Sequence, residues 1–226
     1  MSPSSSSQIE AIVQKDYTVR VWEFIGRGWE LLKQNIGGFI GYTLLISFIS
    51  IILSRLNLEY FERGFNLVSL VSVILAGPLN AGFYIVAFKH LRNRPTTFSD
   101  FFGGFSNFLP LFLIHLVSSL LITLGFIILI IPGIYLMVAY IFGIPFVVDK
   151  HLPFWEAMEA SRKLITRHWF NWLGLLLVLG LLNIVGLLCF GIGVFITIPL
   201  TLCTLAVAYA DIVGLNGNVA GSPTDL

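Results

Sequence analysis

The sequence predicts an all-α polytopic membrane protein, with six transmembrane helices arranged as three hairpins and an amphipathic interfacial helix before each hairpin. Three observations lead to this fold class. Of the 226 residues, 57% are hydrophobic and only 11% are charged. The apolar residues form six stretches, each about long enough to cross a bilayer. The cations collect in alternate connectors between these stretches.

The low charge content excludes an ordinary soluble domain, in which roughly a quarter of the residues are charged. A soluble fold of about this size leaves roughly 30% of its unfolded surface in contact with water, and polar groups must cover much of it. The chain has too few polar groups, so its solvent is lipid. The formal net charge of +1 creates no field that would attract nucleic acid, and no nucleic-acid partner is expected.

The predicted spans are residues 36–54, 65–88, 108–131, 133–148, 170–190 and 194–213. Pro132-Gly133 divides the apolar run 108–148, which is too long for one span, and a link with Gly191 and Gly193 separates the last two spans. The period-two alternation of a membrane β-barrel is absent, so the spans are expected to be helical. Residues 9–215 form one six-helix domain in this prediction. The Ser-rich start, 1–8, and the small, polar tail, 216–226, are expected to be disordered, and no cleavable signal peptide is expected.

Lysine and arginine predict the orientation. One side of the membrane would carry only Arg55 and Arg63. The other side would carry eleven cations: Lys15, Arg20, Arg27, Lys33, Lys89, Arg92, Arg94, Lys150, Arg162, Lys163 and Arg167. By the positive-inside rule the side with eleven is cytoplasmic, and an even number of spans places both termini there.

Three segments that lead into the first, third and fifth spans are predicted to be interfacial helices, at about 18–35, 97–107 and 153–168. In the last, Met158 and Ile165 fall on one helical face while Glu159 and Lys163 fall on the other. The other two segments also carry aromatic stripes, and the middle one begins with a capping-box pattern at Thr97. Aromatic and cationic residues on such helices are typical of the headgroup region of a membrane.

An internal repeat is also predicted. A shift of 133 residues superposes Trp22-Glu23 on Trp155-Glu156, and Pro78-Leu79 matches Pro199-Leu200 at a slightly different offset. The repeating unit is an interfacial helix, a span, and a second span that contains proline. Repeats that begin on the same side are parallel, which does not favour an inverted-repeat transporter.

Polar residues within the predicted spans are few, and Asn80, His115 and Asn183 are the candidates for an intramembrane site. Each also fits a structural role as a hydrogen-bonded packing residue. No acidic or basic residue lies clearly at mid-membrane, which argues against a proton relay or a voltage sensor. Candidate helix-packing residues are Gly37, Gly41, Gly77, Pro78, Pro132 and Pro199.

Candidate residues at the cytoplasmic interface are Asp149, Ser161, Arg162, Lys163, Arg167 and Asp211. Ion pairs at the membrane surface are the expected role of the two aspartates, and the basic helices would attract anionic headgroups, although anchoring of the topology explains their charge equally well. Cys189 and Cys203 are expected to be buried thiols at different depths, with neither a disulfide nor a metal site. No hydrolase, phosphate-loop or metalloprotease motif is present, and no cofactor is expected.

One stretch of the sequence resembles a known pattern, carried by Ile131-Pro132-Gly133-Ile134-Tyr135, Pro145-Phe146-Val147-Val148-Asp149, Glu156-Ala157-Met158, Ser161, Leu164-Ile165 and His168-Trp169. It resembles the membrane domain found with some bacterial glycerophosphodiester phosphodiesterases, and related six-helix bacterial membrane proteins. The resemblance covers about residues 131–174. It departs from the pattern at Asp149, where glutamate is usual, and no phosphodiesterase domain follows, so no catalytic residue carries over. The resemblance implies a protein of a bacterial inner membrane.

Three functions remain open from the sequence. The favoured one is a noncatalytic membrane protein that acts through lipids or protein partners, as a scaffold, an envelope-homeostasis factor or an assembly aid; a homo-oligomer is also compatible. The second is a small carrier or channel for a neutral or amphipathic solute, with Asn80, His115 and Asn183 around its cavity. A membrane-embedded enzyme is the least favoured.

Overall fold

The chain was analysed as a computed structural model, which describes residue 10 and residues 16–60, 67–189 and 191–215. Every regular element in these ranges is a helix, and six helical stretches are long and apolar enough to cross a membrane, which confirms the all-α, polytopic membrane fold. The elements are α2 (Val21–Gln34), α3 (Ile36–Tyr60), α4 (Leu67–Leu91), the 3₁₀-helix η2 (Phe98–Asn107), α5 (Phe108–Ile128), α6 (Ile130–Ala139), α7 (Gly143–Lys150), α8 (Phe154–Thr166), α9 (Trp169–Leu188) and α10 (Val194–Ile212). The predictions of a disordered start and tail, and the residues Lys15, Arg63 and Phe190, lie outside the described residues.

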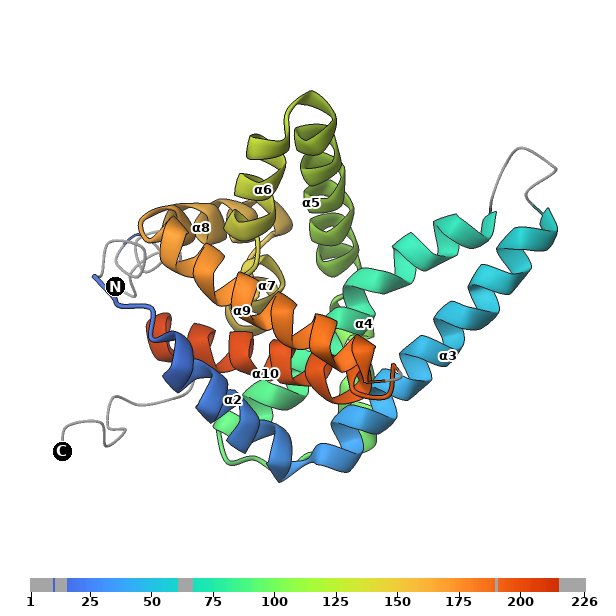
Figure 1. Cartoon of the computed structure of the whole chain (residues 1–226), viewed down its shortest axis with the longest axis horizontal. Helices are drawn as coiled ribbons and strands as arrows, with labels where there is room; N and C mark the ends of the chain where they lie inside the picture. Colours follow the sequence, from blue (N-terminus) through green and yellow to red (C-terminus); the bar gives the residue numbers. More distant parts are fainter. Residues whose placement is uncertain (1–9, 11–15, 61–66, 190, 216–226) are drawn as a thin grey trace.

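The spans form three hairpins, α3–α4, α5–α6 and α9–α10. In Figure 1 the tips of the first two hairpins point in different directions. In each hairpin the second span is the inner one. Half of the α4 window and half of the α10 window are buried, and 44% of the α6–α7 window, against 17% for α3, 17% for the η2–α5 stretch and 22% for α9. The first spans therefore face lipid, and the second spans build the core.

The three inner spans meet around Tyr209 of α10, which is fully buried. Its ring centroid lies 5.3 Å from that of Phe88 in α4, 5.2 Å from that of Phe146 in α7 and 5.4 Å from that of Phe142. Aromatic pairs in this range of distances add about 0.5–1.5 kcal/mol each beyond the apolar area that they bury. We call these four residues the aromatic hub.

Each of the three leading helices packs against the inner span of a different hairpin. η2 packs against α4, α8 against α5, α6 and α7, and α2 against α10. The contact between α2 and α10 joins the two ends of the chain (Figure 1). Close approach depends on small residues at two of these contacts, because a Cβ on Gly28 would lie 2.8 Å from Thr204 Cα and one on Gly104 would lie 2.2 Å from Pro78 O.

Helix boundaries differ from the expected ones in the middle hairpin. The turn falls at Leu129, which is extended, and not at Pro132-Gly133. Pro132 lies in the first turn of α6, where the missing N–H has no helical partner to lose. Gly133 serves the hairpin by packing, since a Cβ on Gly125 would lie 2.9 Å from its Cα.

The fourth span is not one helix but two, α6 and α7, with a break at residues 140–142. Ser161 of α8 bridges this break: its hydroxyl donates to Ala139 O at 2.7 Å and accepts from Phe142 N at 3.1 Å. A buried hydroxyl from another helix thus satisfies backbone groups that the break leaves without a helical partner.

Candidate functional site

Most of the charged residues of the described chain gather at one end of the molecule, formed by α2, η2, α8, the start of α9 and the ends of α4, α7 and α10; we call this the basic end. Its most buried carboxylate is Asp149 in the last turn of α7, whose side chain has no exposed area. Arg92, just after α4, donates to Asp149 Oδ1, and Lys150 Nζ lies 3.1 Å from Oδ2. Tyr209 of the aromatic hub donates to Oδ2 at 3.3 Å. Asp149 thus ties all three inner spans together.

Asp211, near the end of α10, binds the leading helix of the first hairpin. Arg27 Nη1 lies 2.6 Å from Oδ1 of Asp211, and Arg20 Nη2 lies 3.1 Å from Oδ2. Both arginines also reach Glu23. This network is more exposed than that of Asp149, so it contributes less per pair. The ion pairs expected for both aspartates are present.

A third charged contact joins α4 to η2. Lys89 Nζ lies 2.6 Å from Asp100 Oδ1, and Asp100 Oδ2 accepts from Thr97 N at 2.8 Å. The second bond is half of the capping box that the sequence predicted at Thr97. The carboxylate therefore starts η2 and fixes it to the end of α4.

A pocket of about 360 Å³ opens beside these contacts, where the end of α4 meets η2, the start of α5 and the end of α7. Its polar wall comes from Lys89, Arg92, Arg94, Asp100, Asn107 and His151. Its apolar wall comes from Ile85, Phe88, Leu111 and Val148. The pocket therefore offers cations and a hydrophobic surface to the same occupant. We call it the basic pocket.

The other candidates at the interface lie on α8. Arg162 binds Glu159 with both Nε and Nη2, at 2.8 Å and 2.7 Å, and these bonds hold the pKa of Glu159 below its usual value. Lys163 is exposed and lies 3.5 Å from Glu159. Ser161 is buried at the α6–α7 break and is not a surface residue.

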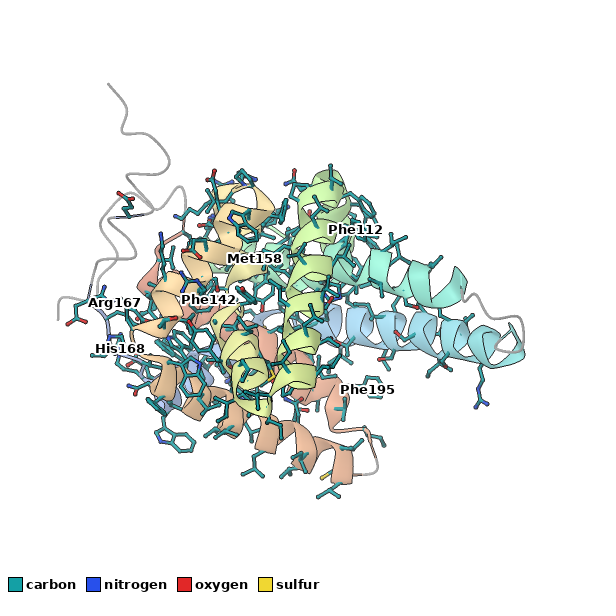
Figure 2. The ribbon with its side chains drawn as sticks, turned by 90° about the horizontal axis from the view of Figure 1, so that it is seen from above. Phe112, Phe142, Met158, Arg167, His168 and Phe195 are labelled. Carbon is teal, nitrogen blue, oxygen red and sulfur yellow. The ribbon has the colours of Figure 1, made fainter. Side chains whose placement is uncertain are left out.

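Arg167 and His168 lie together at the edge of the molecule, with Phe142 further inward (Figure 2). The ring of His168 lies 4.7 Å from that of Tyr17, whose hydroxyl donates to Leu164 O at 2.7 Å and accepts from Trp172 Nε1 at 3.0 Å. Burial raises the pKa of Tyr17. This contact fixes the segment before α2 against α8 and α9.

The three polar residues expected within the membrane do not share a cavity. Asn183 of α9 donates to Thr201 Oγ1 of α10 at 2.8 Å and to Leu179 O. His115 of α5 lies beside Gly77 of α4. Asn80 lines a groove of about 230 Å³ between α3 and α4, and its side chain makes no hydrogen bond within the described residues.

The candidate packing residues differ in what they contact. Gly77 brings α4 against α5, since a Cβ there would lie 2.2 Å from Leu111 O. Pro78 lies inside α4 and contacts Gly104, and Pro199 is buried inside α10. A Cβ added to Gly41 would lie 3.8 Å from Phe98 Cε2 of η2, and among the described residues nothing lies within 4 Å of a Cβ added to Gly37. The Gly37–Gly41 pair therefore joins no two spans within the described chain.

Sequence reasoning missed the residues that build the basic pocket and the aromatic hub. Lys89, Arg92 and Arg94 served only to predict topology, and no functional role was assigned to His151 or Tyr209. Three cations within six residues, directly before a capping box, were the available signal. The pocket itself could not be predicted because its walls come from three separate segments, within residues 85–94, 100–111 and 148–151, whose packing the sequence does not show.

The basic end presents clustered cations and hydrogen-bond donors, a chemistry suited to binding anions. Within the described residues, no three His, Cys, Asp or Glu side chains gather as metal ligands. Comparisons with protein-family models, curated proteins and solved structures found no match for the chain.

Proposed function

We propose that this integral membrane protein is noncatalytic and acts through lipid headgroups at the cytoplasmic face of a bacterial inner membrane, as a scaffold, an envelope-homeostasis factor or an assembly aid. The observation that carries the proposal is the placement of the five tryptophans. Trp22 and Trp29 lie in α2, Trp155 in α8, and Trp169 and Trp172 in the first turn of α9. All five belong to the basic end.

The exposed fractions of two of these tryptophan side chains also support a headgroup-binding role. Trp22 is 76% exposed and Trp155 is 61% exposed, on helices that also carry Arg27 and Lys163. An exposed indole is costly in water and favourable at the boundary between headgroups and acyl chains, where its ring is in contact with lipid and its N–H with polar groups. Cations on the same helices add about 1 kcal/mol each near an anionic leaflet. The basic end therefore has the surface chemistry of a headgroup-binding face.

Tryptophan fluorescence tests the proposal directly, because every tryptophan reports on the basic end. The full chain is placed in vesicles that carry a quencher either on the headgroup or deep on the acyl chain. We expect stronger quenching by the headgroup label, and we expect that W22F with W155F removes most of the quenched signal. W172F is the matched control, because Trp172 is fully buried and should contribute little to quenching. Stronger quenching by the deep label, or none by either, would overturn the proposal.

A second function, a carrier for a neutral amphipathic solute, is favoured by Asn80 alone. A carboxamide without a partner is costly in hydrocarbon, and an amphipathic solute in the α3–α4 groove would supply one. Monoolein is a suitable probe: it should raise the thermal unfolding midpoint of the parent chain more than that of N80L. Equal shifts in the two proteins would exclude this use of the groove.

A further inference from the structure

The basic pocket carries an excess of positive charge that its own carboxylates do not neutralise. Lys89, Arg92 and Arg94 line it, and the carboxylates within reach are Asp100 and Asp149. Asp149 is shared with Lys150, so among the described residues the three cations of the lining have Asp100 and a share of Asp149 as counter-charges. An excess of cations around a concave site with low-dielectric walls attracts an anionic ligand.

Two side chains of the lining are free to bind a ligand. Within the described residues, the side chains of Arg94 and His151 make no hydrogen bond or ion pair, and both are exposed. Arg92 gives one amino group to Asp149, while its buried Nε–H has no acceptor in the part of the chain that the structure describes. The planar guanidinium group matches the oxygens of a phosphate, which it can bind through two parallel hydrogen bonds.

The apolar lining of the basic pocket indicates what the anion is attached to. Ile85, Phe88, Leu111 and Val148 form an apolar surface beside the cations. A small inorganic anion would leave that surface in water, whereas a phosphodiester with an attached acyl-glycerol group would cover it. The volume lies at the lower end of the range for small-molecule pockets, which fits a headgroup and the start of its chains.

The pocket is held in shape by backbone contacts. Gly104 of η2 lies against Pro78 O, so η2 cannot move toward α4 without a clash. Lys89 and Asp100 tie the same two elements together. His151 has a left-handed backbone conformation at φ 53°, where α7 ends. A site whose walls are fixed before the ligand arrives loses less conformational entropy on binding.

We propose that the basic pocket is a binding site for the phosphate group of an anionic phospholipid, held by Arg94 and His151 with Lys89 and Arg92 behind them. The inference deepens the proposed function, on which it rests, by naming one site and one ligand chemistry. A free phosphate ester offers the same oxygens, so the two sources must be separated by experiment.

The experiment uses the full chain in nanodiscs of phosphatidylcholine with increasing phosphatidylglycerol, and native mass spectrometry to count retained lipid. We expect one saturable phosphatidylglycerol site and a fall in apparent affinity of about tenfold in R94Q, the loss expected for a charge-assisted hydrogen bond. The matched control is K33Q, which removes an exposed cation of the same end outside the pocket. Its affinity should change less than twofold.

A second arm identifies the source of the phosphate. Glycerol 3-phosphate is titrated into the detergent-solubilised parent and R94Q proteins. Binding that requires Arg94 and that phosphatidylglycerol fails to displace would overturn the lipid assignment in favour of a soluble ester. No Arg94-dependent binding of either probe, or an equal loss in K33Q, would overturn the site itself. In that case headgroup quenching of Trp22 and Trp155 would still support the proposed function, so the two failures are distinguishable.

Discussion

At the scale of single residues, Asp149 and Asp211 carry the same carboxylate group, but their ion pairs should contribute differently to the stability of the fold. Both accept from two cations at the basic end. Asp149 has no exposed area, and its partners Arg92 and Lys150 are only 18% and 15% exposed, whereas Arg20 and Arg27 around Asp211 are 50% and 41% exposed. Water can solvate the second pair of cations and reaches the first pair much less. Removing the carboxylate should therefore have unequal effects.

We expect Asp149→Asn to destabilise the fold by on the order of 3 kcal/mol, because it removes the buried carboxylate charge that two largely buried cations, Arg92 and Lys150, bind. Asp211→Asn is the control of identical chemistry, and it should cost about 0–1 kcal/mol. Thermal unfolding of the two purified variants in the same detergent measures the contrast. Equal shifts in the unfolding midpoint would mean that burial does not control these pairs.

At the scale of elements, hydropathy predicted that six spans exist but not which of them form the core. The second span of each hairpin is the less hydropathic one. Lipid-facing helices need apolar side chains, while helices inside the bundle tolerate proline, alanine and threonine. Proline in the interior of a span, as at Pro78 and Pro199, is therefore a feature of inner spans that the sequence already contained. The break after α6 was not predictable, because it depends on the distant hydroxyl of Ser161.

The contact between α2 and α10 depends on the absence of a side chain at Gly28. In Gly28→Ala the new Cβ would lie 2.8 Å from Thr204 Cα and 2.9 Å from Thr204 N, and backbone cannot yield as a side-chain tip does. We expect a loss of about 1–3 kcal/mol, measured as a lower unfolding midpoint. Gly26→Ala is the control in the same helix: no atom of the described residues lies within 4 Å of its Cβ, and alanine should stabilise the helix by up to about 1 kcal/mol. If both variants lost stability equally, close packing would not be the cause.

The position of Gly28 is also relevant to the internal repeat, which stays a prediction. Gly28 and Ser161 are 133 residues apart, the offset that superposes the two leading segments. Each contacts the inner span of another hairpin, Gly28 at Thr204 of α10 and Ser161 at the end of α6. A small residue at this point lets an interfacial helix lie close to the span that it covers. The two contacts support a common unit.

At the scale of the whole molecule, the sequence predicted the charged end and missed its cavity for one physical reason. The charge asymmetry is found by counting cations in the connectors along the chain, so it can be predicted without knowledge of the fold. A pocket forms only where several segments pack together. The basic pocket lies between α4, η2, α5 and α7, and their packing depends on contacts such as that of Gly77 with Leu111 O. Arg94 could thus be placed on a side of the membrane from the sequence, but not beside His151.

Orientation across the membrane is the property of the whole molecule on which the proposed function depends. Arg55 near the end of α3 and Arg94 at the basic end are both exposed. With the thiol of Cys189 removed by C189S, R55C should react in intact cells with a membrane-impermeant maleimide, and R94C should react only after the membrane is opened. The difference follows from the retention of cations on the cytoplasmic side during insertion. The reverse pattern would place the basic end outside the cell, away from the anionic cytoplasmic leaflet that the proposed function requires. That result would overturn both the topology and the headgroup proposal.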